Sequence, residues 1–143
     1  MYAYSPDGYI TNTNYLERYP GNDYVDVLGL DTYKLWQNSQ KTEYTAQLNR
    51  LVQMAQQRGK IPALTEVGLN EIPILNWWTD FLLNPVKADS LSKKIAYLLV
   101  WRNFSTSHHF APYPGHSSVA DFLKFYNDPF TIFQNNLQDV YVY

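Results

Sequence analysis

Three carboxylates in this 143-residue chain come directly after short apolar runs of the kind that form buried strands: Asp7, Asp31 and Glu66. If the runs are parallel strands, their ends meet at one edge of the sheet, and polar side chains gather there. Two carboxylates held a few ångströms apart can act as nucleophile and proton donor in the cleavage of glycosidic bonds. These positions are therefore the first candidates for chemistry.

Aromatic side chains accompany the carboxylates. Phe, Trp and Tyr make up 17% of the chain, and 13 of these residues are tyrosines, which stack on sugar rings and offer hydroxyls to them. Because side chains alternate along a strand, we expect two groups to share one face: Val27, Gly29, Asp31 and Tyr33, and beside them Pro62, Leu64 and Glu66. Trp101 ends a fourth apolar run. Trp101 and Tyr33 beside Glu66 would form the floor of a sugar subsite.

Each carboxylate also has a structural explanation. Asp7 lies in a Pro-Asp-Gly sequence, for which a plain turn is the favoured interpretation. For Asp31, a functional role and an ion pair with Arg102 are equally good explanations. Glu66 differs, because Val67 and Gly68 follow it rather than a helical pattern, so helix capping explains it poorly. A role in a site is favoured for Glu66.

Three histidines, His108, His109 and His116, do not make a metal site by sequence, since no pair has helical spacing and no carboxylate lies among them. We expect neither a metal nor another cofactor. The segment 109–116, rich in proline and aromatic residues, is either the wall of a sugar cleft or a packed loop; both interpretations stay open.

The elements that would position these residues alternate as strand and helix, which predicts an α/β fold with a parallel sheet. The predicted strands are Tyr2–Ser5, Val25–Leu30, Ile61–Thr65 and Ile95–Trp101. The predicted helices are Thr42–Arg58, ended by Gly59; Asn76–Leu83 and Asp89–Lys94, separated by a break at Asn84-Pro85; and Ser117–Tyr126, with Ser117 or Ser118 as the N-cap.

Composition excludes several classes of function. The formal net charge of −2 and a pI near 5.8 provide no basic surface for nucleic acid. No run of eighteen apolar residues predicts a membrane span, and the first residues do not form a signal peptide. The absence of cysteine leaves the compartment open. The length fits a single domain over residues 1–143.

Five sequence strings at the strand ends together resemble the later part of glycoside hydrolase family 26, chiefly endo-β-1,4-mannanases. They are Tyr4-Ser5-Pro6-Asp7, Asp26 to Tyr33, Leu64 to Gly68, Val100-Trp101-Arg102-Asn103, and His109 to His116. The resemblance extends from Met1 to about Phe133. It implies that the chain is the C-terminal half, strands five to eight, of a TIM-type (β/α)8 barrel.

The resemblance also implies roles for individual residues in a retaining endo-β-1,4-mannanase that acts on β-mannan or manno-oligosaccharides. Glu66 matches the catalytic nucleophile. Asp31 and Tyr33 match residues that orient the sugar before the cleaved bond, with Tyr33 touching the nucleophile, and Trp101 matches the hydrophobic platform under that sugar. Three residues resemble ones that line the neighbouring cleft: Arg102, Asn103 and His116.

One departure from the family is large. In the family, the acid/base glutamate lies at the end of barrel strand four, whereas the first strand of this chain resembles barrel strand five. The sequences around Asp7, Asp31 and Glu71 do not match the sequence string of the family's acid/base glutamate. We therefore expect this chain alone to be inactive, and its exposed sheet edges to pair with an N-terminal barrel half or with a second copy as a homodimer.

Two other functions stay open: a non-catalytic polysaccharide-binding or scaffold protein, and a barrel acting on another β-linked glucan or xylan. Family habit implies a secreted, periplasmic or cell-surface location.

Overall fold

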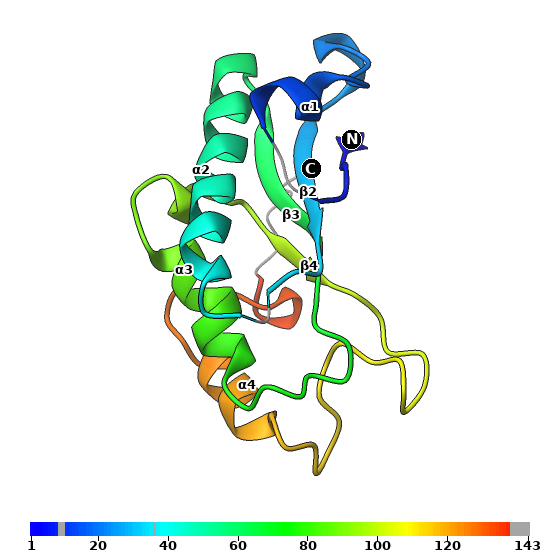
Figure 1. The fold of residues 1–143 in the computed structure, drawn as a ribbon, viewed down its shortest axis with the longest axis vertical. Helices are drawn as coiled ribbons and strands as arrows, with labels where there is room; N and C mark the ends of the chain where they lie inside the picture. Colours follow the sequence, from blue (N-terminus) through cyan, green and yellow to red (C-terminus); the bar gives the residue numbers. More distant parts are fainter. Residues whose placement is uncertain (9–10, 36, 138–143) are drawn as a thin grey trace.

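The computed structural model describes residues 1–8, 11–35 and 37–137, and its four strands form one parallel sheet in the order β1-β2-β3-β4 (Figure 1). The strands are β1 Ala3–Tyr4, β2 Val27–Thr32, β3 Ile61–Val67 and β4 Leu98–Val100. All four overlap the predicted strands, and the predicted parallel α/β fold is confirmed. β1 and β4 lie at the two edges of this sheet.

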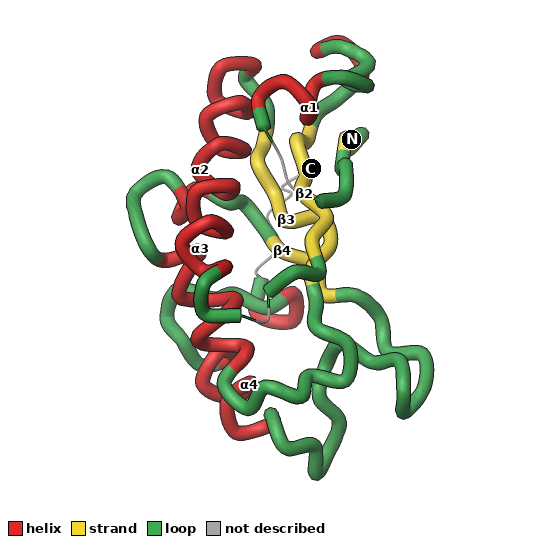
Figure 2. Tube along the Cα trace, in the orientation of Figure 1, coloured by secondary structure: helices red, strands yellow, loops and turns green. Residues whose placement is uncertain are grey.

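The helices of residues 40–58, 84–87 and 119–126 lie on one side of the sheet (Figure 2). All helical segments of the described chain connect the strands or follow the last one. They are α1 Asn12–Leu16, the 3-10 turn η1 Asn22–Tyr24, α2 Gln40–Arg58, the π-helix η2 Trp77–Leu83, α3 Asn84–Lys87, η3 Ser92–Lys94, α4 Val119–Tyr126 and η4 Gln134–Asn136. As predicted, α2 ends at Gly59, which adopts the left-handed conformation (φ 63°, ψ 37°) that glycine tolerates best.

The core lies between this helical layer and the sheet. Leu28 and Leu30 of β2 and Leu64 of β3 are fully buried there, against Leu48 and Leu51 of α2. The α2 leucines are three positions apart, the spacing that places side chains on one face of a helix. The opposite face of the sheet carries the residues of the candidate site.

The predicted break at Asn84-Pro85 is wrong. The π-helix η2 continues directly into α3, and Asn84 keeps right-handed helical angles (φ −60°, ψ −43°). Pro85 is the second residue of α3 and directly follows the π-helical turns. The break comes after Lys87, and the predicted helix Asp89–Lys94 is only the short turn η3.

The carboxylate of Asp89 explains that shortening. It accepts hydrogen bonds from the backbone N–H groups of Leu91 (2.8 Å) and Ser92 (2.9 Å). Such a local bond competes with helix formation and favours a turn. A hydrogen bond from the Asn49 side chain, and then these backbone bonds, lower the pKa of Asp89.

The last helix, α4, begins at Val119, close to its predicted start, and Ser118 is its N-cap residue, as one of the two predicted alternatives had it. Ser118 occupies the N-cap position without a side-chain capping bond, and its hydroxyl lies 3.0 Å from Nδ1 of His116 instead. Asp121 accepts hydrogen bonds from the N–H (3.0 Å) and hydroxyl (2.7 Å) of Thr79. Asp121 therefore ties α4 to the start of the π-helix.

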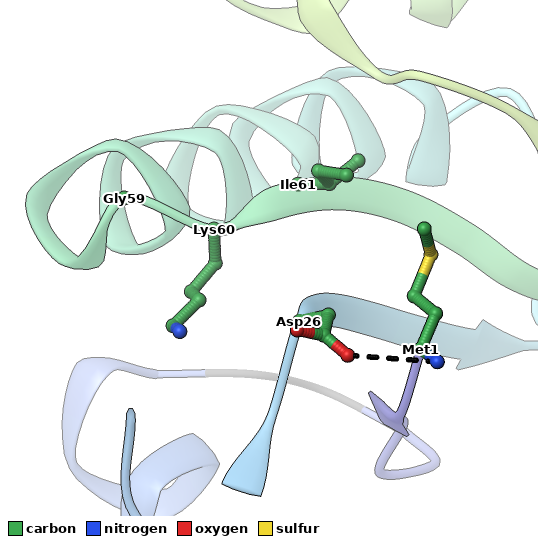
Figure 3. Close-up of a pocket in the computed structure, with 5 residues that line it drawn as sticks. All are labelled: Met1, Asp26, Gly59, Lys60 and Ile61. Atoms are coloured by element: carbon green, nitrogen blue, oxygen red, sulfur yellow. Dashed lines mark ion pairs between the residues drawn. The ribbon is translucent and has the colours of Figure 1, made fainter. Parts of the chain in front are cut away.

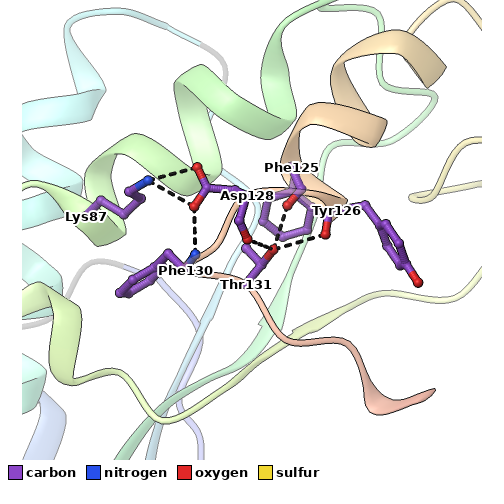
Figure 4. Close-up of polar contacts among 6 residues, drawn as sticks. All are labelled: Lys87, Phe125, Tyr126, Asp128, Phe130 and Thr131. Carbon is purple, nitrogen blue, oxygen red and sulfur yellow. Dashed lines mark hydrogen bonds and ion pairs between the residues drawn. The ribbon is translucent and has the colours of Figure 1, made fainter. Parts of the chain in front are cut away.

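The segment after α4 is fixed against α3 (Figure 4). Lys87 donates to both carboxylate oxygens of Asp128 at 2.8 and 3.0 Å, which lowers the pKa of Asp128. The hydroxyl of Thr131 donates to the Phe125 carbonyl at 2.7 Å. These contacts close the helical layer at its C-terminal end.

No helix in the described part of the chain is both long enough and apolar enough to cross a membrane.

Candidate active site

A β-bulge in β3 determines where Glu66 points. Gly29 pairs with Ala63 and Asp31 with Glu66, so β3 has one residue more than β2 over this stretch; the pairing of β3 with β4 shows the same excess between Leu64 and Val67. Bulges of this kind redirect side chains, often beside active sites. The extra residue changes the alternation of side chains along β3.

The prediction that Leu64 and Glu66 share a face is therefore wrong. Leu64 is fully buried in the core on the helical side. Thr65 faces the other way, where its hydroxyl hydrogen-bonds that of Ser5, the residue after β1. A side chain at Gly29 would meet Thr65, since an added Cβ would lie 2.5 Å from Cγ2. The bulge thus needs a glycine on the neighbouring strand.

Tyr33 and Glu66 are in direct contact. The Tyr33 hydroxyl donates a hydrogen bond to Oε1 of Glu66. Burial, and then the hydrogen bond to Glu66, raise the pKa of Tyr33 well above its usual value. Tyr33 is therefore a fixed hydrogen-bond donor that holds one oxygen of the carboxylate.

Asp31 lies beside Glu66 as its partner in the strand register. Its Oδ1 is buried and accepts no hydrogen bond from the described residues. Burial, then the charges of Glu66 and Asp7, raise the pKa of Asp31 to about 6. The ion pair considered for it does not form, because the guanidinium of Arg102 lies over the Phe104 ring, 5.0 Å from its centroid.

Asp7 does not lie in the plain turn predicted for it, because its backbone forms an isolated parallel bridge with Asp31. Its side chain is exposed, and Gly8 adopts a positive φ of 99° that favours glycine. Two hydrogen bonds form this bridge to the end of β2, from the Gly8 N–H to the Asp31 carbonyl (3.1 Å) and from the Asp31 N–H to the Pro6 carbonyl (3.2 Å). Asp7 thus helps to place β2 and adds negative charge near Asp31.

Trp101 and Arg102 directly follow β4. The Trp101 N–H donates to the Val67 carbonyl at 3.1 Å, which attaches this segment to the end of β3. The Trp101 side chain is half-buried and that of Arg102 is exposed. Both residues therefore lie next to the strand that carries Glu66, and their contacts with a ligand remain predictions.

Asn103 holds the loop that follows it. Its Oδ1 accepts hydrogen bonds from the N–H groups of Phe110 and Ala111, both at 2.9 Å, and its Nδ2 donates to the Ala111 carbonyl at 2.9 Å. This role was not predicted, because the partners are backbone groups that sequence does not distinguish. A ligand contact for Asn103 remains a prediction.

His116 connects the same loop to the segment after β3. Its Nδ1 accepts the Ser118 N–H at 3.2 Å, so Nε2 carries the proton and donates to the Glu71 carbonyl at 3.1 Å. The Glu71 N–H in turn donates to the His109 carbonyl at 2.8 Å. Glu71 has a positive φ of 61°, a strained conformation that these two bonds hold in place.

Phe110, in the segment 109–116 that was predicted as a cleft wall or a packed loop, supports Tyr33, and this contact was not predicted. Its buried ring packs edge-to-face on Tyr33 with centroids 5.5 Å apart. It also covers Gly68, where an added Cβ would come within 2.5 Å of Cδ1. The available signal was Gly68, two residues after Glu66, because a glycine beside a site often marks the close approach of another group.

A surface pocket lies at the other end of the sheet, formed by Met1, Asp26, Gly59, Lys60 and Ile61 (Figure 3). The amino group of Met1 is 3.9 Å from Oδ2 of Asp26. Ile61 begins β3 and Glu66 is five residues further on, which is about 17 Å along an extended strand. The pocket is therefore separate from the carboxylates.

Within residues 1–8, 11–35 and 37–137, no three His, Cys, Asp or Glu side chains are grouped as metal ligands.

Comparison with known proteins gives consistent matches. The family model of glycosyl hydrolase family 26 matches residues 1–102. A mannan endo-1,4-β-mannosidase from Bifidobacterium adolescentis is 33% identical over 147 residues, which cover 87% of this chain. Two solved structures are also similar. A family 26 β-mannanase from Bacteroides ovatus is 36% identical with a TM-score of 0.80 over 99% of this chain. A modular endo-β-1,4-mannanase from Cellulomonas fimi is 35% identical with a TM-score of 0.87 over 96% of this chain.

This chain spans only part of each relative. It covers 14% of the Bifidobacterium protein, 42% of the Bacteroides chain and 32% of the Cellulomonas chain. The parallel α/β fold described above therefore corresponds to a fragment of a family 26 TIM barrel.

Proposed function

Since the chain belongs to glycosyl hydrolase family 26, we propose that it forms, as a single domain, the part of a retaining endo-β-1,4-mannanase barrel that carries the nucleophile, Glu66. One observation supports this role most strongly: Glu66 lies at the bulge of β3 and is held by the Tyr33 hydroxyl at the carboxyl end of the parallel sheet. The mannan-cleaving activity named for the relatives supports the substrate class.

In the proposed mechanism, the Glu66 carboxylate attacks the anomeric carbon and forms a covalent glycosyl ester while the glycosidic oxygen leaves. A second carboxyl group, roughly 5 to 5.5 Å away, protonates that oxygen and then activates the water that breaks the ester. Tyr33 fixes one oxygen of Glu66, so that the other can attack. A pre-positioned nucleophile lowers the entropic part of the barrier.

The sugar before the cleaved bond would lie over Trp101, with a hydroxyl donating to Asp31. The buried Oδ1 of Asp31 has no partner among the described residues, and an unpaired buried acceptor is costly, so a ligand hydroxyl would stabilise it. Arg102, Asn103 and His116 would line the adjacent cleft.

We propose that the acid/base comes from the other half of the barrel. Asp31 neighbours Glu66 on the adjacent strand, Asp7 forms a bridge with Asp31 and Glu71 lies in the loop after β3. None of the three matches the family's acid/base string. The other half would also pair with the edge strands β1 and β4. A secreted, periplasmic or cell-surface location is proposed from family habit.

The test compares this chain alone with a completed barrel, made by fusing it behind strands one to four of a family 26 mannanase. The chain alone should bind mannohexaose without cleaving it. The completed barrel should hydrolyse galactomannan, and Glu66→Ala should abolish that hydrolysis.

Other outcomes would overturn parts of the proposal. Glu66-dependent cleavage by the chain alone would show that the acid/base lies within these residues. Cleavage of glucan or xylan in preference to mannan would refute the substrate. Binding by an inactive completed barrel would favour the polysaccharide-binding function.

A further inference from the structure

We propose that Phe104, with Arg102 over its ring, is a second sugar-stacking platform for units of the β-mannan chain that lie further from the cleaved bond. This inference rests on the proposed function, because it assigns an additional contact to the same substrate. The site requires neither a metal nor the acid/base.

A continuous row of rings leads from the nucleophile to Phe104. Tyr33, which holds Glu66, packs on Phe110 with centroids 5.5 Å apart; Phe110 packs on His108 at 5.2 Å, and His108 on Phe104 at 6.2 Å. All three contacts are edge-to-face, with interplanar angles of 66°, 77° and 85°. The row therefore connects the subsite of Glu66 to the surface.

Phe104 is the exposed end of this row. It is 71% exposed, whereas Phe110 is 6% exposed and belongs to the interior. A phenylalanine with so little of its ring buried adds little to folding stability. Packing within the described chain therefore does not account for an aromatic residue at this position.

The segment that presents Phe104 is held in place by hydrogen bonds. The Phe104 N–H donates to the His108 carbonyl at 2.8 Å, and the His108 N–H donates back to the Ser105 carbonyl at 3.2 Å. Asn70, in the loop after β3, donates to the Ser107 carbonyl at 3.2 Å. The segment projects away from α2 and α4 (Figure 1). A ring fixed in this way loses little entropy on binding.

The chemistry of the pair fits a neutral pyranose. The apolar C–H face of a sugar can stack on the ring, as in other aromatic carbohydrate sites. The guanidinium of Arg102, 5.0 Å from the ring centroid, has five N–H donors for ring hydroxyls. An extended β-1,4-linked chain in the subsite of Glu66 would then reach Phe104 with a more distant unit.

The experiment measures dissociation constants of mannobiose and mannohexaose for the unmodified chain by isothermal titration calorimetry. Phe104→Leu should weaken mannohexaose binding by about two- to tenfold, the range expected for one aromatic contact, and leave mannobiose binding unchanged. Phe104→Trp should retain the wild-type preference for the longer ligand.

Phe130→Leu is the matched control, because Phe130 also has a cation near its ring, Lys87 at 5.9 Å, but lies after α4. It should bind both ligands as the wild type does. One outcome would refute Phe104 as a stacking platform and leave the proposed function intact: Phe104→Leu binds mannohexaose as the wild type does, whereas Trp101→Ala binds it more weakly. Failure of the wild-type chain to bind either sugar would overturn both.

Discussion

The Tyr33 hydroxyl donates a hydrogen bond to Oε1 of Glu66, although the two residues are 33 positions apart in the sequence. The contact forms because β2 and β3 are adjacent parallel strands and because a bulge turns Glu66 towards the end of β2. Phe110 packs on the Tyr33 ring and limits its movement. Tyr33 is thus a positioning residue for the proposed nucleophile.

Tyr33→Phe should therefore lower the kcat of the completed barrel on mannohexaose by about 10- to 100-fold, the equivalent of one hydrogen bond to a charged group. KM should change little, because the lost bond orients the carboxylate rather than the substrate. Steady-state kinetics, which gives kcat and KM separately, tests this prediction. Tyr24→Phe, at an exposed tyrosine in η1, is the control and should behave as the wild type. A changed KM with an unchanged kcat would argue against a positioning role.

Gly29→Ala should destabilise the chain by about 1–3 kcal/mol, because the added methyl group would overlap Thr65 at the bulge. The double variant Gly29→Ala/Thr65→Ala should recover part of this loss, since Cγ2 and Oγ1 are removed. Urea unfolding of the two single variants and the double variant gives the coupling energy. Purely additive effects would show that Thr65 is not the obstacle.

Asp31→Asn should change how stability depends on pH. The pKa of Asp31 in the folded chain is about 6, above the ordinary value of 3.8. Between these values the folded chain retains a proton that the unfolded chain has lost, so rising pH favours unfolding over this window. The melting temperature of the wild type should fall between pH 4 and pH 6.5 by more than that of Asp31→Asn.

Asp23→Asn, at an exposed carboxylate in η1, is the control for that comparison and should follow the wild-type pH dependence. Parallel curves for wild type and Asp31→Asn would contradict the raised pKa.

Asn103→Ala should destabilise the chain by about 1–2 kcal/mol, because two backbone N–H groups of the following loop lose their acceptor. Thermal unfolding followed by near-UV circular dichroism would detect this change. Asn135→Ala removes a single 3.3 Å contact with Tyr126 and should have a smaller effect. Equal stability of the two variants would show that Asn103 does not hold the loop.

Much of the fold was predictable from local patterns. The continuous apolar runs predicted the four parallel strands, and Gly59 predicted the end of α2. Both predictions succeeded because strand burial and helix termination depend on residues that are near in sequence. Pro85 misled the prediction, since its effect depends on the π-helix that precedes it. Local sequence did not show that context.

The site was less predictable. The face of Leu64 was predicted wrongly because the bulge depends on the packing of Thr65 over Gly29, on another strand. The contact between Tyr33 and Glu66 followed from resemblance to the family, not from spacing. The bonds of His116 were not predictable, because they reach the Glu71 carbonyl, 45 positions away.

The most direct test of the role of Glu66 is covalent trapping with a β-mannosyl fluoride that carries a second fluorine at C2. The Glu66 carboxylate would form a bond to the anomeric carbon as the C–F bond breaks, and fluoride leaves without needing a proton from the acid/base. The fluorine at C2 slows hydrolysis of the resulting ester.

Mass spectrometry of the intact chain, followed by peptide mapping, should find one fluoromannosyl group per molecule, attached to Glu66 and absent from Glu66→Gln. A folded chain that stays unlabelled, or that is labelled on Asp31 or Asp7 instead, would contradict the assignment of Glu66 as the nucleophile.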